Sequence, residues 1–253
     1  MYELENYIKY PDNCIVGEKI PKKTIYDAAE LVSKDNNLFK NVDRIIWIYS
    51  LKKSNTNIDS YSNDELVYNE IEVIEVEMSR KVDDTERISQ ILQRFIPYPT
   101  LVVFHFNEQL QLSVAHQREH KADSEKITLT EHRMTDWIRL MNLDIFDEKQ
   151  FDDLKLDNLS KINFYELYSD MVDSVTLYNS SKQVGRILTI SASEAKEINN
   201  LIYEIDKEMR KLKAAIKKET QFNKQAEINM ELHKLKVKKE DLRSQLVWYY
   251  GRN

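Results

Sequence analysis

The sequence predicts an α+β protein, with a mixed α/β N-terminal body around a central sheet and a C-terminal antiparallel helical hairpin. Two patterns lead to this prediction. Segments with strand-like and helix-like apolar spacing alternate over the first 160 residues. From Ile198 onward, apolar residues recur at alternating intervals of four and three residues, and this register breaks near residues 220–223. We therefore expect a body at residues 1–160, a connecting helix and strand at 161–192, and the hairpin at 193–253.

The body is expected to begin with an irregular arm. Residues 1–21 contain Pro11 and Pro21, and their apolar residues follow neither the helical nor the strand period. Helical spacing starts after Pro21, with the apolar residues from Ile25 to Val32, and a second short helix is expected at residues 33–39.

The clearest strand is residues 42–52, which are apolar on both faces, as expected for an interior strand. A polar loop at residues 53–64 precedes a second strand at residues 66–78. Asp83 and Glu86 then have the spacing of a capping box, which predicts the start of a helix. The other strands of the body are expected at residues 100–106, 109–117 and 126–133.

A helix at residues 164–178 and a strand-like segment at 186–190 are expected to lead to the hairpin, with Ser193 as the cap of its first helix. The second apolar seam is out of phase with the first. This favours two helices that fold back on each other, across a turn at residues 219–224, over one long rod. The first seam consists of Ile198, Ile202, Ile205, Met209, Leu212 and Ile216, and the second of Ile228, Leu232, Leu235, Leu242 and Leu246.

Composition excludes several classes of protein. The one cysteine, Cys14, excludes an internal disulfide and Cys-rich zinc clusters. The three glycines, Gly17, Gly185 and Gly251, lie too far apart for a Walker loop or a dinucleotide fingerprint. An acidic N-terminus and the lack of a stretch of about 18 apolar residues argue against a signal peptide and a membrane span. We therefore expect a cytoplasmic protein that does not contact a membrane.

The charge is distributed unevenly along the chain. The net charge is -6, but residues 194–253 contain 14 Lys and Arg against 10 Asp and Glu. Six basic residues near the hairpin tip are candidates for nucleic-acid binding, because a basic tip on an acidic protein suits phosphate contact. Solvated charges outside a coiled-coil seam explain them equally well. The six residues are Arg210, Lys211, Lys213, Lys217, Lys218 and Lys224.

Three carboxylates form a candidate catalytic cluster. Glu75 and Glu77 lie two apart on a predicted strand and share one face of it, and Asp43 opens the neighbouring strand. The predicted order of elements is similar to the core of restriction-type nucleases, which use Mg²⁺. This order is helix, strand, strand with Glu-x-Glu, helix and strand. Ser79 stands where the lysine of their motif is expected. The alternative is an ordinary solvated strand face.

Several segments together resemble the bacterial domain-of-unknown-function family 4391. The resemblance covers most of the chain and rests on the order of the segments. It implies a bacterial protein whose genes lie near helicases and DNA methyltransferases of restriction or phage-defence loci, and it supplies no catalytic residues. The segments are Ile20-Pro-Lys-Lys, Asp43-Arg-Ile-Ile-Trp-Ile-Tyr-Ser-Leu, Glu72-Val-Ile-Glu-Val-Glu, Phe95-Ile-Pro-Tyr-Pro, Leu110-Gln-Leu-Ser-Val-Ala and Gln221-Phe-Asn-Lys.

We therefore expect a non-catalytic accessory or adaptor protein of a bacterial DNA-processing or anti-phage defence system. Its body would dock on a larger enzyme, such as a helicase or a DNA methyltransferase, and its hairpin would reach a partner or nucleic acid. One alternative is a divergent metal-dependent nuclease. Another is a structural protein that dimerises through a coiled coil. No cofactor is expected, apart from Mg²⁺ under the nuclease alternative.

Overall fold

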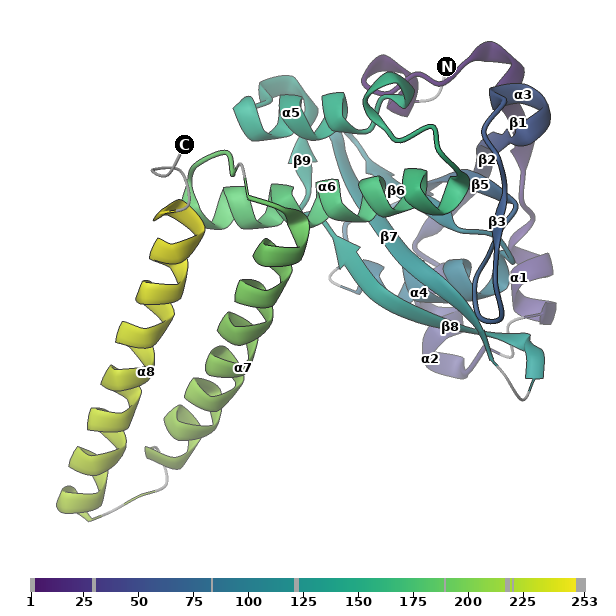
Figure 1. Cartoon of the computed structure of the whole chain (residues 1–253). Helices are drawn as coiled ribbons and strands as arrows, with labels where there is room; N and C mark the ends of the chain where they lie inside the picture. The colour runs from purple at the N-terminus through teal and green to yellow at the C-terminus, as the bar shows by residue number, and fades with distance from the viewer. Residues whose placement is uncertain are drawn as a thin grey trace. The chain divides into compact units, whose positions relative to one another are not determined.

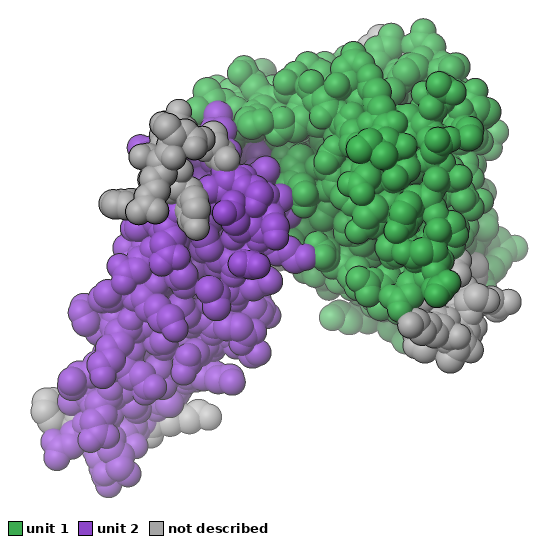
Figure 2. Space-filling view, in the orientation of Figure 1, with its two compact units in different colours: residues 1–175 green, residues 176–253 purple. Residues whose placement is uncertain are grey.

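The computed structural model describes residues 3–28, 31–82, 84–120, 123–188, 190–216, 219 and 221–248. The chain divides into two compact units, residues 1–175 and residues 176–253 (Figure 2). We call them the body and the hairpin unit. The division falls within helix α6 (Phe164–Val184). It therefore lies between residue 160, where we expected the body to end, and residue 193, where we expected the hairpin to begin.

The body is built on a seven-stranded mixed sheet (Figure 1). The order of its strands is β1-β2-β5-β6-β7-β8, and β9 pairs with β7. β2 is antiparallel to both of its neighbours, β1 and β5, whereas β5 and β6 run parallel. A separate two-stranded sheet is formed by β3 and β4. The strands are β1 (Ile15–Lys19), β2 (Val42–Lys52), β3 (Tyr61–Ser62), β4 (Val67–Tyr68), β5 (Glu70–Met78), β6 (Thr100–Phe106), β7 (Gln109–His120), β8 (Asp123–Met134) and β9 (Ile138–Arg139).

Helices cover both faces of this sheet. α4 connects the parallel strands β5 and β6, as parallel pairing requires. It packs with α1 and α2 over a core that includes Ile74, Ile88 and Phe104. The first part of α6 crosses the other face (Figure 1). The α-helices are α1 (Lys22–Ala28), α2 (Ser33–Phe39), α3 (Lys53–Thr56), α4 (Thr85–Phe95), α5 (Ile145–Asp153), α7 (Ala192–Ile216) and α8 (Phe222–Trp248), and the 3-10 helices are η1 (Glu3–Asn6), η2 (Asp12–Cys14), η3 (Leu140–Asn142) and η4 (Leu156–Asn158).

The hairpin unit confirms the predicted pair of helices. α7 ends at Ile216 and α8 begins at Phe222, so the chain reverses where the apolar register breaks. Members of both predicted seams, among them Ile202 and Leu242, share one hydrophobic core. The seam also contains Lys239, whose Nζ atom lies 2.6 Å from Asp206 Oδ1 on the facing helix.

Two predictions about the connections of the hairpin were wrong. Residues 186–190 form no strand among the described residues, because Leu188 and Ile190 are buried in the hairpin core instead. Gly185, at φ 70°, ends α6, and the chain turns there toward α7. The cap of α7 is Ser191 rather than Ser193. Ser191 Oγ accepts from the Glu194 backbone N–H at 3.2 Å, and the Glu194 carboxylate accepts from the Ser191 N–H at 3.0 Å.

Three predictions in the body also need correction. The expected irregular arm contains strand β1, which pairs with β2. A β-bulge between Ile15 and Glu18 interrupts this pairing, so the apolar residues of the strand do not alternate. The expected loop at residues 53–64 contains α3 and β3. The expected strand at residues 66–78 is divided into β4 and β5. Asp83 lies outside the described residues. Over the part of the chain described, none of the helices is both long and apolar enough to cross a membrane.

Candidate functional site

The predicted carboxylates lie at one end of the antiparallel pair β2–β5. Glu75 and Glu77 share a face of β5, where Glu77 pairs across the ladder with Arg44. Arg44 Nε donates a hydrogen bond to Glu77 Oε2. Asp43 is exposed and sits where the register of the two strands shifts. The pKa of Arg44 is raised by this hydrogen bond and by the charges of Glu77, Glu75 and Asp43. All three carboxylates therefore act on one guanidinium group.

The structure does not bring Asp43, Glu75 and Glu77 together as a group that could hold a metal ion. Among the described residues, no three His, Cys, Asp or Glu side chains lie close enough together to hold a metal ion. Mg²⁺ needs carboxylate oxygens that converge on one point. Near Asp43, Glu75 and Glu77 a positive charge is already provided by Arg44. We derive no metal-dependent step from these residues.

A second polar cluster, which the sequence analysis missed, joins α4 to β7 and β8. His132 Nε2 lies 3.1 Å from Ser113 Oγ and 3.3 Å from Ser89 Oγ, and the two hydroxyl oxygens are 2.6 Å apart. His132 Nδ1 lies 3.7 Å from Glu86 Oε1. The order serine, histidine, carboxylate resembles a hydrolase triad. Both serines, however, have no exposed surface, so a substrate has no access to them.

His132 is neutral at pH 7. Burial lowers its pKa to about 4, and the positive charges of Arg133 and Arg94 act in the same direction. The contact with Glu86 would be an ion pair only if the imidazole were protonated. Because the Glu86 side chain is 64% exposed, water screens its charge and the effect of burial prevails. The cluster is therefore a neutral hydrogen-bonded network inside the body.

The same face of α4 carries further buried polar side chains. Thr85 Oγ1 donates to Gln111 Oε1 at 2.7 Å, and Gln111 Nε2 donates to the Thr135 carbonyl at 2.8 Å. Gln117 Nε2 donates to the backbone carbonyl of Gln93 at 2.6 Å, and the Gln93 side-chain Nε2 donates to the backbone carbonyl of Thr100 at 3.5 Å. Thr85, Ser89 and Gln93 follow one another at intervals of four, which places them in one row on the helix. This spacing of four residues is the sequence pattern from which a row of buried polar side chains on the helix could have been predicted.

A buried carboxylate lies on the same face of the sheet. Glu72, on β5, is 1% exposed and accepts hydrogen bonds from Trp47 Nε1 at 2.5 Å and from Ser50 Oγ at 3.2 Å. Burial raises its pKa to about 7, and the nearby charge of Glu70 acts in the same direction. Lys52 Nζ is 3.6 Å from Glu70 Oε2. Sequence reasoning singled out Glu75 and Glu77 on this strand and overlooked the buried Glu72.

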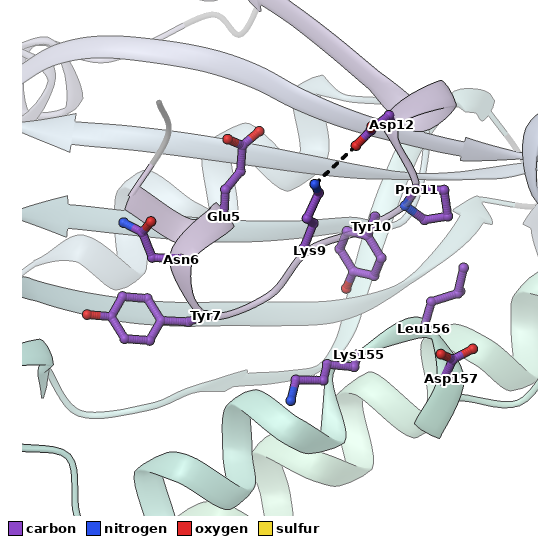
Figure 3. Close-up of a pocket in the computed structure, with 10 residues that line it drawn as sticks. All are labelled: Glu5, Asn6, Tyr7, Lys9, Tyr10, Pro11, Asp12, Lys155, Leu156 and Asp157. Atoms are coloured by element: carbon purple, nitrogen blue, oxygen red, sulfur yellow. Dashed lines mark ion pairs between the residues drawn. The ribbon is translucent and has the colours of Figure 1, made fainter.

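A hollow of about 700 Å³ lies between the N-terminal arm and η4 (Figure 3). Its charged groups already have partners. Lys9 Nζ is 3.3 Å from Asp12 Oδ1, and Lys155 Nζ is 2.9 Å from Asp152 Oδ1. At its floor the buried Tyr10 hydroxyl donates to the Leu154 carbonyl at 3.0 Å. The hollow therefore offers a ligand few groups that are not already bound.

The predicted basic residues of the hairpin do not share one face. Arg210 and Lys213 follow the seam residues Met209 and Leu212 by one position, which places both on the same side of α7. Lys211 lies on the opposite side of that helix, and Lys224 has the corresponding position on α8. These four side chains form no ion pair with another described residue. Lys217 and Lys218 lie outside the described residues.

On one side, the two helices together form a surface that we call the basic face. Because the helices are antiparallel, the residues that follow their seam positions lie on the same side of the hairpin. The Lys239–Asp206 pair, which joins the helices on this side, fixes that register. Tyr203, which is 60% exposed, lies on the same side of α7 as Arg210, two helical turns before it. The exposed charged and aromatic residues of the basic face are Tyr203, Arg210, Lys213, His233, Lys236 and Glu240, and Glu240 Oε2 lies 3.7 Å from Arg243 Nη1.

The opposite side of the hairpin, which we call the mixed face, carries charges of both signs. Its acidic side chains outnumber its basic ones, so the field outside it is weak or negative. Lys207 lies on the outer line of α7, 3.2 Å from Glu204 Oε2 of the mixed face. The mixed face consists of Glu204, Glu208, Lys211, Lys224, Glu227, Glu231, Lys234, Lys238 and Asp241.

The fold and these surfaces define an α+β protein with a helical hairpin and with its polar clusters buried in the body. Residues 8–238 match the family described as Domain of unknown function (DUF4391), so the chain belongs to this family. The match confirms the resemblance found in the sequence. No curated protein and no solved structure matches the chain.

Proposed function

We propose that this protein is a non-catalytic accessory protein of a bacterial DNA-processing or anti-phage defence system, and that its body docks on a helicase or a DNA methyltransferase. The choice of partner follows from what membership of family 4391 implies. The observation that carries the proposal is a pair of large apolar side chains, Met141 and Ile145, exposed on the body, together with unpaired cations on one face of the hairpin unit. The hairpin unit also exposes apolar residues, among them Met230 and Val237.

The apolar surface of the body supports protein docking. Met141 in η3 is 79% exposed and Ile145, the first residue of α5, is 60% exposed. Single exposed apolar residues are ordinary, but contiguous apolar patches mark interaction sites. These two side chains lie four residues apart, and burying both against a partner would contribute about 3 kcal/mol.

The buried clusters support a role without catalysis. Ser89 and Ser113 have no exposed surface, and the nearby His132 is held neutral inside the body. The carboxylates Glu75 and Glu77 lie beside Arg44 rather than around an open position. In each cluster the groups that would perform chemistry are enclosed or already bound.

The test is co-elution of the full chain with the helicase or the methyltransferase encoded beside it. The double variant Met141→Asp/Ile145→Asp should abolish co-elution, because each change puts a charge into a dry interface. Met230→Asp/Val237→Asp is the matched control, since it places the same charges on exposed apolar residues of α8. If co-elution is lost only in Met230→Asp/Val237→Asp, the docking surface is on α8 of the hairpin unit and not on the body. No co-elution of the wild type with either enzyme would refute the proposal.

The nuclease alternative has one observation in its favour. The antiparallel pair β2–β5, followed by α4 and by β6 parallel to β5, has the element order expected of that class. Incubation of the purified protein with plasmid DNA and Mg²⁺ or Mn²⁺ tests it. We expect no nicking. Nicking by the wild type that persists in Glu108→Ala and disappears in Glu75→Ala would replace the accessory role with a nuclease.

Dimerisation, the third function, also has one observation in its favour. Met230 and Val237 are 63% and 49% exposed, and their spacing of seven residues places them on one line of α8. Light scattering after size exclusion measures the mass of the protein. We expect a monomer. A dimer that Met230→Asp/Val237→Asp converts into a monomer would assign α8 to self-association.

A further inference from the structure

We propose that the basic face of the hairpin unit binds the phosphate backbone of duplex DNA. The proposal rests on the proposed function only for its choice of DNA as the nucleic acid. It differs from a general attraction to the hairpin tip, because it assigns binding to one side of the two helices and excludes the other.

Charge complementarity carries the proposal. Arg210, Lys213 and Lys236 are exposed, and none forms an ion pair with another described residue. On the same side Asp206 is occupied by Lys239, with its two oxygens 2.6 Å from the ammonium nitrogen. Glu240 on the same side lies 3.7 Å from Arg243 through its Oε2 atom, so the described carboxylates of this side, Asp206 and Glu240, are both paired with other cations. Phosphate groups are the natural partners of such a surface.

The mixed face provides the contrast within the same two helices. At the same level of the hairpin, Lys211, Lys234 and Lys238 stand among Glu204, Glu208 and Glu231. A phosphate that approached these lysines would also meet the carboxylates, whose repulsion offsets the attraction. Lysine and arginine counts along the sequence do not distinguish the two faces. The distinction follows from the antiparallel register that the Asp206–Lys239 pair fixes.

The geometry favours a duplex over a single strand. Arg210 and Lys213 lie three residues apart on α7, about 4.5 Å along its axis. Lys236 projects from the facing helix, so the cations have fixed relative positions on a rigid support. Single-strand binding usually depends on several aromatic side chains that stack on bases, and Tyr203 is the one aromatic residue in the basic face.

Two matched triple variants of the full chain test the proposal. Arg210→Glu/Lys213→Glu/Lys236→Glu reverses the basic face, and Lys211→Glu/Lys234→Glu/Lys238→Glu reverses three cations of the mixed face. Both triples change the net charge by the same amount, and none of the six residues lies in the seam. Equal thermal midpoints and equal circular dichroism would establish that both variants fold.

Fluorescence anisotropy with a 20-base-pair duplex and with the corresponding single strand measures binding between 50 and 200 mM salt. Three phosphate contacts predict a log-log slope of about -2.7, so the wild-type affinity for duplex should fall about 40-fold over this range. The basic-face variant should lose this salt dependence and most of its affinity. The mixed-face variant should retain both.

Three outcomes would overturn the inference. Equal losses in the two variants would indicate attraction to the whole hairpin rather than to one face. Stronger binding of the single strand would reject the duplex as partner. Absence of wild-type binding at 50 mM salt would remove DNA as a ligand of the hairpin. The proposed accessory function is tested separately by co-elution, and it stands if Met141→Asp/Ile145→Asp abolishes co-elution while DNA binding fails.

Discussion

In the body, polar side chains are drawn into the core, whereas between helices α7 and α8 of the hairpin unit most polar side chains stay outside the core. Ser89, Gln93 and Ser113 have no exposed surface, and Glu72 has almost none. Between α7 and α8 the described core residues are apolar, and Lys239 at a seam position is paired with Asp206. The buried polar residues of this unit, Thr176, Ser180 and Ser181, lie in α6 instead. The two units therefore depend on different interactions for their structure.

This difference assigns structural rigidity to the body and ligand recognition to the hairpin unit. Buried hydrogen bonds have strict geometry, so the row of polar residues on α4 fixes how this helix lies on β7 and β8. A hairpin with an apolar seam needs no polar contacts to hold its helices together, so its charges remain available to a partner. We interpret the body as the unit whose shape is fixed and the hairpin as the unit whose charges recognise a ligand.

The largest expected effect comes from a charge in the seam. Leu242→Asp should lower the unfolding free energy of the hairpin unit by about 4 kcal/mol, because it buries an unpaired carboxylate. Val237→Asp is the control, since the same charge on the outer line of α8 stays in water. Urea unfolding followed by circular dichroism at 222 nm and by tryptophan fluorescence measures both variants. Equal losses in the two would contradict the assigned seam.

Acidification should destabilise the body through His132. Its folded pKa of about 4 is below the unfolded value of 6.5, so the unfolded state takes up the proton first. The stabilisation from the neutral imidazole is complete above pH 6.5 and decreases as the pH falls toward 4. Between pH 7 and pH 4.5 we expect the unfolding free energy of the wild type to fall by about 2.5 kcal/mol more than that of His132→Gln. A difference that does not change with pH would show that this histidine is not buried as described.

Glu72 should produce the opposite slope. Its folded pKa of about 7 is above the unfolded value of 4.5, so the folded state keeps its proton longer. Stability should therefore decrease as the pH rises from 4.5 to 7, by about 2 kcal/mol between pH 5 and pH 7. Glu72→Gln carries no ionisable group and should lack this decrease. If the variant and the wild type lose stability in parallel, the carboxyl group titrates in solvent-like surroundings.

The sequence predicted those elements whose pattern is local. β2 and α2 have the bounds that their apolar spacing indicated, and the reversal before Phe222 was visible as a break in register. β1 was missed because a bulge disrupts its alternation. The segment around Leu188 was misread as a strand because its apolar residues serve the hairpin core, which spacing alone does not reveal.

The surfaces and clusters depend on contacts between distant residues, and the sequence predicted them less well. The basic residues of the tip were found, but their separation into two faces requires the antiparallel register of α7 and α8. His132 and Ser89 are 43 residues apart, so their contact has no local signature. The raised pKa of Glu72 depends on the burial of its side chain, which the Glu-x-Glu pattern does not distinguish from exposure.

Hydroxyl-radical footprinting read by mass spectrometry tests the division of tasks most directly. Three reactive side chains report on the three surfaces, because Met141, Tyr203 and Met230 are all at least 60% exposed. Met141 reports on the body, Tyr203 on the basic face and Met230 on the outer line of α8. Duplex DNA should protect Tyr203 and leave both methionines reactive, and the enzyme partner should protect Met141 alone. Protection of Met141 by DNA, or equal protection of Tyr203 and Met230, would contradict the assignment of DNA to the basic face and of protein docking to the body.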